Sequence, residues 1–146
     1  MSLPRSLAFS FVLLLAICRC GAEISASHSP KEPKSADPVV ITVTTTSTPV
    51  KADDLTLEYQ VVEPGAYIAL GDPGFATQWT SLPLSVTGIT LKNGQKFTAT
   101  IPGDVQKHRR LVRYRIHSRV DDKIVAPAPD DTQPNYAYFV YDGIPE

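Results

Sequence analysis

Cysteine is scarce in this sequence. Only two occur among the 146 residues, Cys18 and Cys20, and both lie within the first 22. A domain formed by the rest of the chain therefore has no disulfide available, and its stability must come from buried apolar surface. Residues 39–146 suffice for one domain of ordinary size, which buries on the order of 65% of its extended-chain surface. We expect a single domain with a substantial hydrophobic core.

Recognisable catalytic motifs are also missing. The sequence has no Gly-x-Ser-x-Gly, no phosphate-binding glycine loop and no His-Glu-x-x-His, and its three histidines are scattered. The aspartate pairs at 53–54, 121–122 and 130–131 lack the spacing of a calcium loop and fall at predicted turns, where aspartate is favoured. We therefore expect no enzyme, no catalytic residues, no cofactor and no metal site.

The only long apolar run lies at the N-terminus. Arg5 is followed by the apolar stretch 7–17 and then by the small residues Gly21 and Ala22. A positive start, about ten apolar residues and a small-residue exit are the parts of a secretory signal, and the run is too short to span a bilayer of roughly 30 Å. We predict a signal peptide over 1–22 and a secreted, periplasmic or cell-surface mature chain without a transmembrane segment.

A lipoprotein signal is the alternative for the same segment. Residues 15–18, Leu-Ala-Ile-Cys, approach a lipobox, in which Cys18 would carry a lipid anchor. Ile17 is bulky where such a motif has Gly or Ala. This departure favours removal of both cysteines with the leader.

Charge of one sign is not in excess. Without residues 1–22 the chain loses Arg5 and Arg19, which leaves a net charge of about −3 and gives no reason to expect nucleic acid as a partner. Residues 23–38 are polar, proline-punctuated and free of any period, which predicts a disordered linker. His28 lies in that stretch with no second ligand at a usable spacing, so we expect it to face solvent.

From residue 39 the apolar residues recur with a period of two, which is typical of strands with one buried face. Leu55, Leu57, Tyr59 and Val61 form the clearest case, and the residues between them are predicted to be wet. Asn93-Gly94 separates two alternating runs and predicts a tight hairpin. Turns every 8 to 12 residues and no helical period indicate an all-β, antiparallel sandwich of about seven or eight strands, of immunoglobulin or fibronectin type III character. The expected strands lie at about 39–46, 55–62, 75–84, 86–91, 96–101, 111–118, 124–126 and 136–141.

The aromatic residues are predicted to serve mainly the core. We expect Trp79, the one tryptophan, to pack between the sheets, and Tyr114 to be a core or tyrosine-corner residue whose hydroxyl finds a backbone partner. An alternative use of the aromatics is a sugar-stacking platform. Its members would be Tyr67, Trp79, Tyr136, Tyr138 and Tyr141.

Residues 39–146 also resemble a known family segment. The resemblance is carried by residues 66–70, 79–80, 97–102, 109–116 and 130–145. They are similar to the Ig-like segment of large secreted bacterial proteins that carry lamin-tail domains and a kinase-like module of the spore-coat CotH type. The resemblance implies an accessory β-sandwich without catalytic residues, here as a stand-alone or truncated module. Residues 85–95 are shorter than the Asp/Gly-rich insertion usual in that family.

One local charge bias stands out as a candidate binding site. Arg109 and Arg110 precede a strand on which Arg113, Arg115 and His117 share the predicted solvent face. This basic stripe would meet an acidic polysaccharide, a cell-wall polymer or an acidic protein surface. The opposing interpretation is that acidic residues such as Glu58 neutralise the stripe on neighbouring strands. We expect a non-catalytic structural or interaction module with an extracellular protein partner, and a polysaccharide binder as its alternative.

Overall fold

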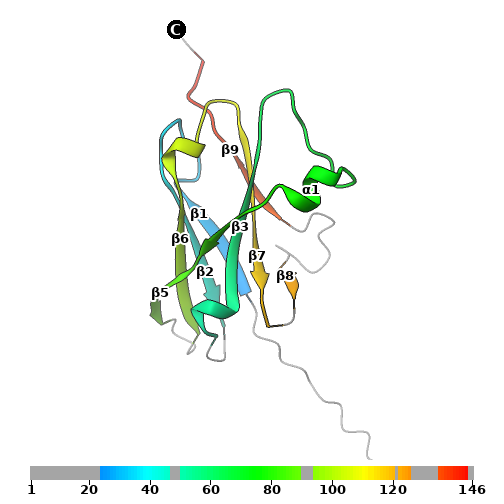
Figure 1. The fold of residues 1–146 in the computed structure, drawn as a ribbon. Coiled ribbons are helices and arrows are strands. Elements are labelled where there is room, and N and C mark those ends of the chain that lie inside the picture. Colours follow the sequence, from blue (N-terminus) through cyan, green and yellow to red (C-terminus); the bar gives the residue numbers. More distant parts are fainter. Residues whose placement is uncertain (1–23, 47–49, 90–93, 121, 126–134, 145–146) are drawn as a thin grey trace, which may run out of the picture.

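The regular secondary structure of the described residues is mainly β-strand, as a computed structural model shows (Figure 1). The structure describes residues 24–46, 50–89, 94–120, 122–125 and 135–144. The predicted signal peptide and the predicted Asn93 turn position lie outside these residues. No helix in the described ranges is long and apolar enough to cross a membrane.

The described residues contain nine strands, which form two antiparallel sheets. The first sheet has the order β1-β2-β6-β5, and the second has the order β4-β3-β7-β8, with β9 also paired to β7. The prediction of an all-β fold is therefore confirmed. The strands are β1 (Ile24–Ser29), β2 (Val39–Thr45), β3 (Leu55–Val62), β4 (Thr80–Pro83), β5 (Ser85–Ile89), β6 (Gln95–Ile101), β7 (Leu111–Ser118), β8 (Lys123–Val125) and β9 (Tyr136–Phe139).

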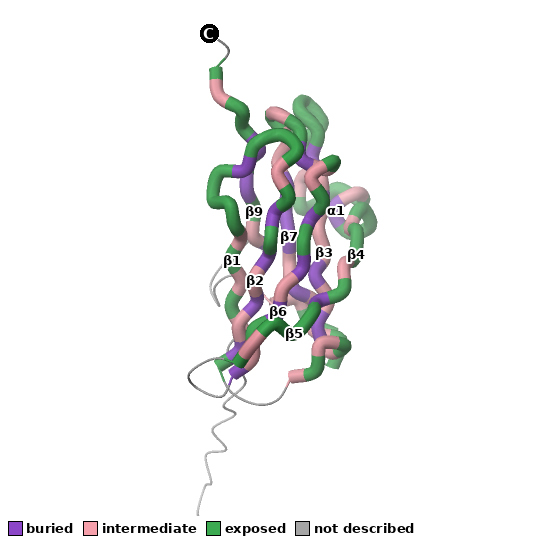
Figure 2. The backbone as a smooth tube through the Cα atoms, turned by 90° about the vertical axis from the view of Figure 1, so that its left-hand side faces the viewer, coloured by how far each residue is buried: buried purple, intermediate pink, exposed green. Residues whose placement is uncertain are grey.

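A single hydrophobic core lies between the two sheets. Val39, Ile41 and Val43 of β2 are fully buried, and they pack in one cluster with inward residues of the second sheet such as Leu57 and Ile116. In Figure 2, buried stretches alternate with partly buried and exposed ones along the strands. Alternation of apolar and polar residues thus gives each sheet one buried face. The predicted hairpin between β5 and β6 is also present, with a register shift between Val86 and Gly88.

The interpretation of 23–38 as a disordered linker is wrong for the described part of that stretch. Residues 24–29 form β1, which pairs with β2 from Ile24 opposite Thr45 to Ser29 opposite Val40. Ile24, Ala26 and His28 turn partly inward, whereas the serines between them are exposed. The sequence therefore has a period of two here, which low strand propensity of serine hides. Residues 30–38 connect β1 to β2.

Part of the outer face of the second sheet is covered by residues 63–79. Residues 63–79 leave β3, cross this face and include the short helix α1 (Pro73–Thr77) before β4 begins. Gln60 and Val62, which the alternation places on a wet face, are therefore buried. Two single turns of 3-10 helix, at Ala52–Asp54 and Gly103–Val105, complete the described elements.

Candidate interaction surface

The predicted basic stripe lies on the outer face of β7, but its central residue is not available to a ligand. Arg113 is only 6% exposed. Its Nη1 donates hydrogen bonds to the Gln60 side-chain oxygen at 3.0 Å and to the Ile68 carbonyl at 2.8 Å. The guanidinium also lies over the rings of Tyr67 and Phe75, at 5.2 and 5.5 Å from their centroids. The prediction that Arg113 faces solvent is therefore wrong, because residues 63–79 fold over it.

Arg115, the next stripe residue on this face, is neutralised within the molecule. Its Nε donates to a Glu58 carboxylate oxygen at 2.7 Å, and its guanidinium lies 4.0 Å from the centroid of the Trp79 ring. Trp79 in turn donates its indole N–H to the Phe75 carbonyl. The prediction that Trp79 packs between the sheets is wrong, since the indole covers the outer face. The interpretation in which Glu58 neutralises the stripe describes this pair correctly.

His117 is also held between acidic side chains. Its two ring nitrogens lie 3.6 Å from a Glu58 oxygen and 2.8 Å from an Asp122 oxygen. The histidine borders a polar hollow of about 390 Å³ between β3, β4 and β7, which Ser81 and Arg119 also line. The positive and negative charges of the stripe nearly balance at this end of the sheet. It therefore contains no row of uncompensated basic side chains that would attract an acidic polymer.

Arg109 and Arg110, the remaining candidates, lie in the turn before β7 and differ in their surroundings. Arg110 donates to both carboxylate oxygens of Glu63 and to the Val105 carbonyl. Arg109 is exposed, adopts a φ of 69°, and its backbone N–H donates to the Val140 carbonyl. No carboxylate among the described residues pairs with the Arg109 side chain. Of the five predicted binding residues, Arg109 alone presents an accessible and uncompensated charge.

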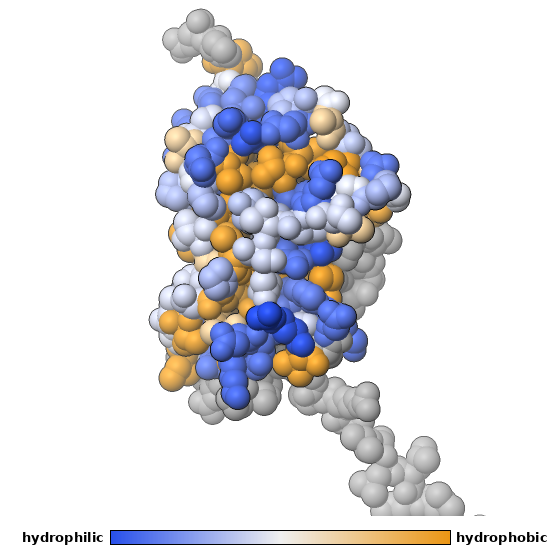
Figure 3. Space-filling model, viewed as in Figure 1, coloured by the Kyte–Doolittle hydropathy of each residue, from blue (hydrophilic) through white to orange (hydrophobic). Residues whose placement is uncertain are grey.

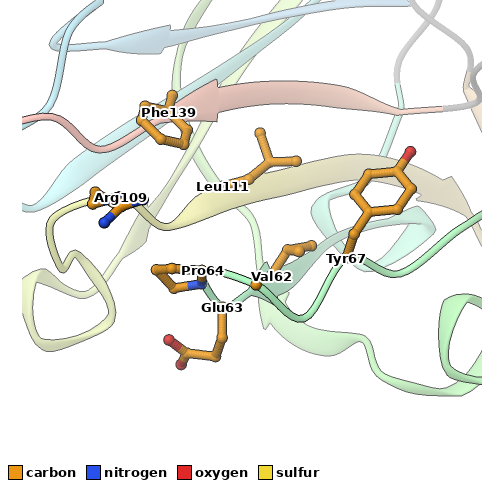
Figure 4. A pocket seen from close by; sticks show the side chains of 8 residues that line it. Val62, Glu63, Pro64, Tyr67, Arg109, Leu111 and Phe139 are labelled. Atoms are coloured by element: carbon orange, nitrogen blue, oxygen red, sulfur yellow. The ribbon is translucent and has the colours of Figure 1, made fainter.

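Beside Arg109 lies an apolar groove of about 320 Å³. In Figure 4, Phe139 and Pro64 stand on either side of Leu111, Tyr67 lies at one end, Arg109 lies at the other, and the Glu63 carboxylate points away. Figure 3, which has the orientation of Figure 1, shows a patch of hydrophobic surface bordered by hydrophilic residues in the upper half of the molecule. The groove is lined by Val62, Glu63, Pro64, Gly65, Tyr67, Arg109, Leu111 and Phe139.

The groove is formed by residues from different strands, and their proximity could not be predicted from the sequence. Val62, Leu111 and Phe139 lie side by side on three strands because Leu111 pairs with Val62 on one side and with Phe139 on the other. Tyr67 and Phe139 remain 69% and 50% exposed, which is unusual for large aromatic side chains. One feature of the sequence indicates the groove: Leu111 lies on the same face of β7 as the basic residues, where an apolar side chain is not expected.

The other aromatic residues do not form a sugar-stacking platform. Tyr138 is 5% exposed and Tyr114 only 1% exposed, and Tyr114 stacks on Tyr136 with centroids 5.0 Å apart and rings inclined by 10°. The Tyr114 hydroxyl contacts the Nδ1 atom of His28 at 3.1 Å. The prediction of Tyr114 as a core residue is confirmed, but its hydroxyl partner is a side chain of β1. The prediction that His28 faces solvent is wrong.

The described residues contain no group of three or more His, Cys, Asp or Glu side chains arranged to hold a metal ion. Of the aspartate pairs, residues 121 and 130–131 lie outside the described ranges. Asp54 accepts a backbone hydrogen bond from Lys51, which is the local turn role predicted for such pairs.

Comparison with known proteins adds little to this description. No protein-family model matches the chain, and no curated protein matches it. A solved structure described as "AvmM Catalyzes Macrocyclization in Alchivemycin A Biosynthesis" aligns with 85% of this chain and 92% of its own, at 9% identity and a TM-score of 0.23. An alignment with so low a TM-score carries no argument about fold or function here.

Proposed function

We propose that this protein is an exported, non-catalytic interaction module with a sandwich of the immunoglobulin or fibronectin type III kind. The strand orders support the fold type. If β1, β2, β6 and β5 are taken as strands A, B, E and D, and β3, β7 and β9 as C, F and G, the sheets have the ABED and CFG orders of an Ig-like domain. The resemblance to Ig-like segments of secreted bacterial proteins agrees with this topology, and the signal peptide predicted over residues 1–22 supports export.

The observation that carries the proposal is the apolar groove between Tyr67, Leu111 and Phe139. Exposed aromatic side chains around a hollow are typical of protein-recognition sites, where aromatic and arginine residues contribute much of the binding energy. Arg109 gives the rim one positive charge, while Glu63 is engaged by Arg110. The partner that fits is a protein segment with an apolar side chain for the groove and a neighbouring carboxylate for Arg109.

The basic stripe gives no comparable support for an acidic polysaccharide. Arg113 is buried, and Arg115 is paired with Glu58. An extended polyanion binds through several accessible cations at once, and of the five candidates only Arg109 has an accessible charge without an acidic partner. The protein-binding role is therefore the function we propose.

A display experiment with random peptides tests this role. Peptides selected on the purified protein are expected to be enriched in an apolar residue next to Asp or Glu. Phe139→Ser should lower the affinity for a selected peptide by at least about tenfold, because it removes one wall of the groove. Arg109→Gln should lower this affinity by less, and the difference from the unaltered protein should disappear at high salt because exposed charges are screened.

Arg119→Gln is the matched control, because Arg119 is also exposed but borders the polar hollow. The control should bind the selected peptide as the unaltered protein does. Both groove residues are exposed, so the variants should keep the wild-type β-rich circular dichroism spectrum. Selected peptides that bind the Phe139→Ser and Arg109→Gln variants with unchanged affinity, or a selection that yields no binder, would overturn the proposal.

A further inference from the structure

The N-terminal strand β1 contacts the second sheet through a half-buried histidine, His28. β1 is an edge strand whose ladder partner is β2 alone. On its inner side His28 reaches across to the second sheet, where its ring lies 5.0 Å from the Tyr138 ring and 5.8 Å from the Tyr114 ring. A second polar link joins the Ala26 backbone N–H to the Tyr136 hydroxyl at 3.3 Å. These side-chain contacts connect β1 to the sheet that it does not pair with.

The hydrogen bonds define which protonation state of His28 fits this place. Nε2 lies 3.4 Å from the Lys31 carbonyl oxygen, which can only accept, so Nε2 carries the proton. Nδ1 of the neutral ring is then an acceptor, and the Tyr114 hydroxyl donates to it over 3.1 Å. Tyr114 is almost fully buried, and no other acceptor for its hydroxyl occurs among the described residues. The neutral imidazole satisfies both groups.

A second proton on the ring breaks this arrangement. Nδ1 becomes a donor to the Tyr114 oxygen, so the Tyr114 O–H loses its acceptor inside the sandwich. A buried donor without an acceptor is costly. We propose that β1 is a pH-sensitive latch, held against the second sheet by neutral His28 and loosened when that ring takes up a proton. Loosening β1 would uncover the edge of β2 and the inner rings of Tyr114 and Tyr138.

The surroundings of His28 favour the neutral ring. Burial lowers its pKa below the usual 6.5, the hydrogen bond to the Lys31 carbonyl opposes this shift, and the positive charge of Lys31 adds to it. The groups that face the ring from β7 and β9 are tyrosines. Burial raises the pKa of Tyr138 to about 12 and that of Tyr114 further, so both hydroxyls stay neutral in mild acid. No described carboxylate pairs with His28 to stabilise an imidazolium ion.

The sign of the pH dependence follows from the lowered pKa. The unfolded or released strand binds a proton more readily than the folded one below pH 6.5, so attachment of β1 weakens as the pH falls from there towards the folded pKa. Well above pH 6.5 both forms are neutral, and the contribution of His28 to attachment no longer changes with pH. The effect should be local, because the central strands β2 and β6 do not depend on this ring.

Hydrogen exchange and NMR titration of the whole protein test the latch. Between about pH 7 and about pH 4.5, the protection factors of the β1 amides should fall about tenfold relative to those of β6, and the fall should level off at the measured pKa of His28. Tyr114→Phe removes the hydroxyl whose bond favours the neutral ring, so it should raise the pKa of His28. This variant keeps the shape of the buried ring.

His28→Gln is the main variant, because an amide preserves a neutral hydrogen-bonding side chain but does not titrate in this range. It should abolish the acid-dependent loss of β1 protection. His117→Gln is the matched control on the outer face and should leave that loss unchanged. The latch is overturned if β1 protection does not depend on pH, if it changes only together with that of β6, or if His28→Gln retains the wild-type pH profile. Should His28→Gln fail to fold, the unaltered protein decides: the latch requires the loss of β1 protection to level off at the measured pKa of His28, and a loss that continues unchanged below that pKa overturns it.

Discussion

The guanidinium of Arg115 lies over the indole ring of Trp79, with its Cζ atom 4.0 Å from the ring centroid. Both side chains stand on the outer face of the second sheet, where β7 and the end of the covering segment 63–79 meet. Glu58 accepts from the Nε atom of the same guanidinium at 2.7 Å. A charge that the alternation assigns to solvent is therefore enclosed by a ring and a carboxylate, and it fastens the covering segment to the sheet.

The cation–π contact should be measurable as a coupling free energy. In a double-mutant cycle of Trp79→Leu and Arg115→Met, we expect a coupling of about 1 kcal/mol in the free energy of unfolding, because partly buried contacts of this kind contribute about 0.5–2 kcal/mol. Chemical denaturation of the four proteins gives the value. Trp79→Leu combined with Arg119→Met is the control cycle, and its coupling should stay below about 0.5 kcal/mol. Equal couplings in the two cycles would refute the contact.

Arg113 is predicted to be a structural residue and not a ligand contact. Arg113→Met retains most of the side-chain volume but leaves the Gln60 oxygen and the Ile68 carbonyl without their donor. A buried polar atom without a partner costs about 1–3 kcal/mol, so we expect unfolding to become easier by about 2–4 kcal/mol. Arg119 is an exposed residue directly after the end of β7. Arg119→Met should therefore change the free energy of unfolding by less than about 0.5 kcal/mol. Urea denaturation of both variants distinguishes the two cases.

Strands with one face in the core could be predicted from the sequence, because burial alone imposes their period of two. β2 shows this in Val39, Ile41 and Val43, which are apolar at every second position and all fully buried. β7 follows the same rule with Val112, Tyr114 and Ile116 inward. The period specifies which face is inside, but it carries no information about what covers the other face. For that reason the period does not reveal that Arg113 and Arg115 are covered.

Residues 63–79 show why the outer face could not be predicted. Their prolines and glycines indicate turns, but the position of Phe75 against Arg113 depends on contacts between segments far apart in the chain. Burial of Gln60 gives a further example, since its side chain donates to the Gly74 carbonyl at 3.2 Å and accepts from Arg113. A polar residue on such a face signals a buried network only once its partners are known. The groove at Phe139 likewise depends on strand pairing.

Asp142 ties the segment after β9 to the connection between β1 and β2. The Ser35 hydroxyl and backbone N–H each donate to its carboxylate at 2.6 Å, and these bonds hold the pKa of Asp142 below its usual 3.8. A lowered carboxyl pKa means that this tie is complete above pH 3.8 and is lost as the pH falls through the folded value. Ser35→Ala removes the larger contribution and should raise the pKa of Asp142 towards 3.8. Carboxyl-carbon NMR titration measures the shift.

The control for this titration is Ser81→Ala, an exposed serine on β4 that does not contact Asp142. Its Asp142 should titrate as in the unaltered protein. An Asp142 pKa that is the same in the Ser35→Ala variant and the unaltered protein would show that the hydrogen bond from the Ser35 hydroxyl does not form in solution.

Export is the part of the proposed function that rests on residues 1–22, and a single charge tests it. Leu14→Arg places a cation in the middle of the apolar stretch, which should prevent its recognition as a signal. We expect the unaltered chain, expressed with its leader in a bacterial host, to appear outside the cytoplasm with Glu23 as its first residue. The Leu14→Arg variant should remain in the cytoplasm at full length. Cell fractionation followed by mass spectrometry measures both the location and the N-terminus.

Two further variants separate a cleaved leader from a lipid anchor. Cys18→Ser removes the residue that a lipoprotein would modify, and it should change neither export nor the mass of the mature chain if cleavage follows Ala22. Leu14→Ile, which keeps the stretch apolar, is the control for the arginine substitution and should be exported normally. Incorporation of labelled fatty acid that depends on Cys18 would establish the anchor instead, because a lipid-modified cysteine is retained in the mature protein. Export of Leu14→Arg at the wild-type level would mean that residues 1–22 do not act as a signal.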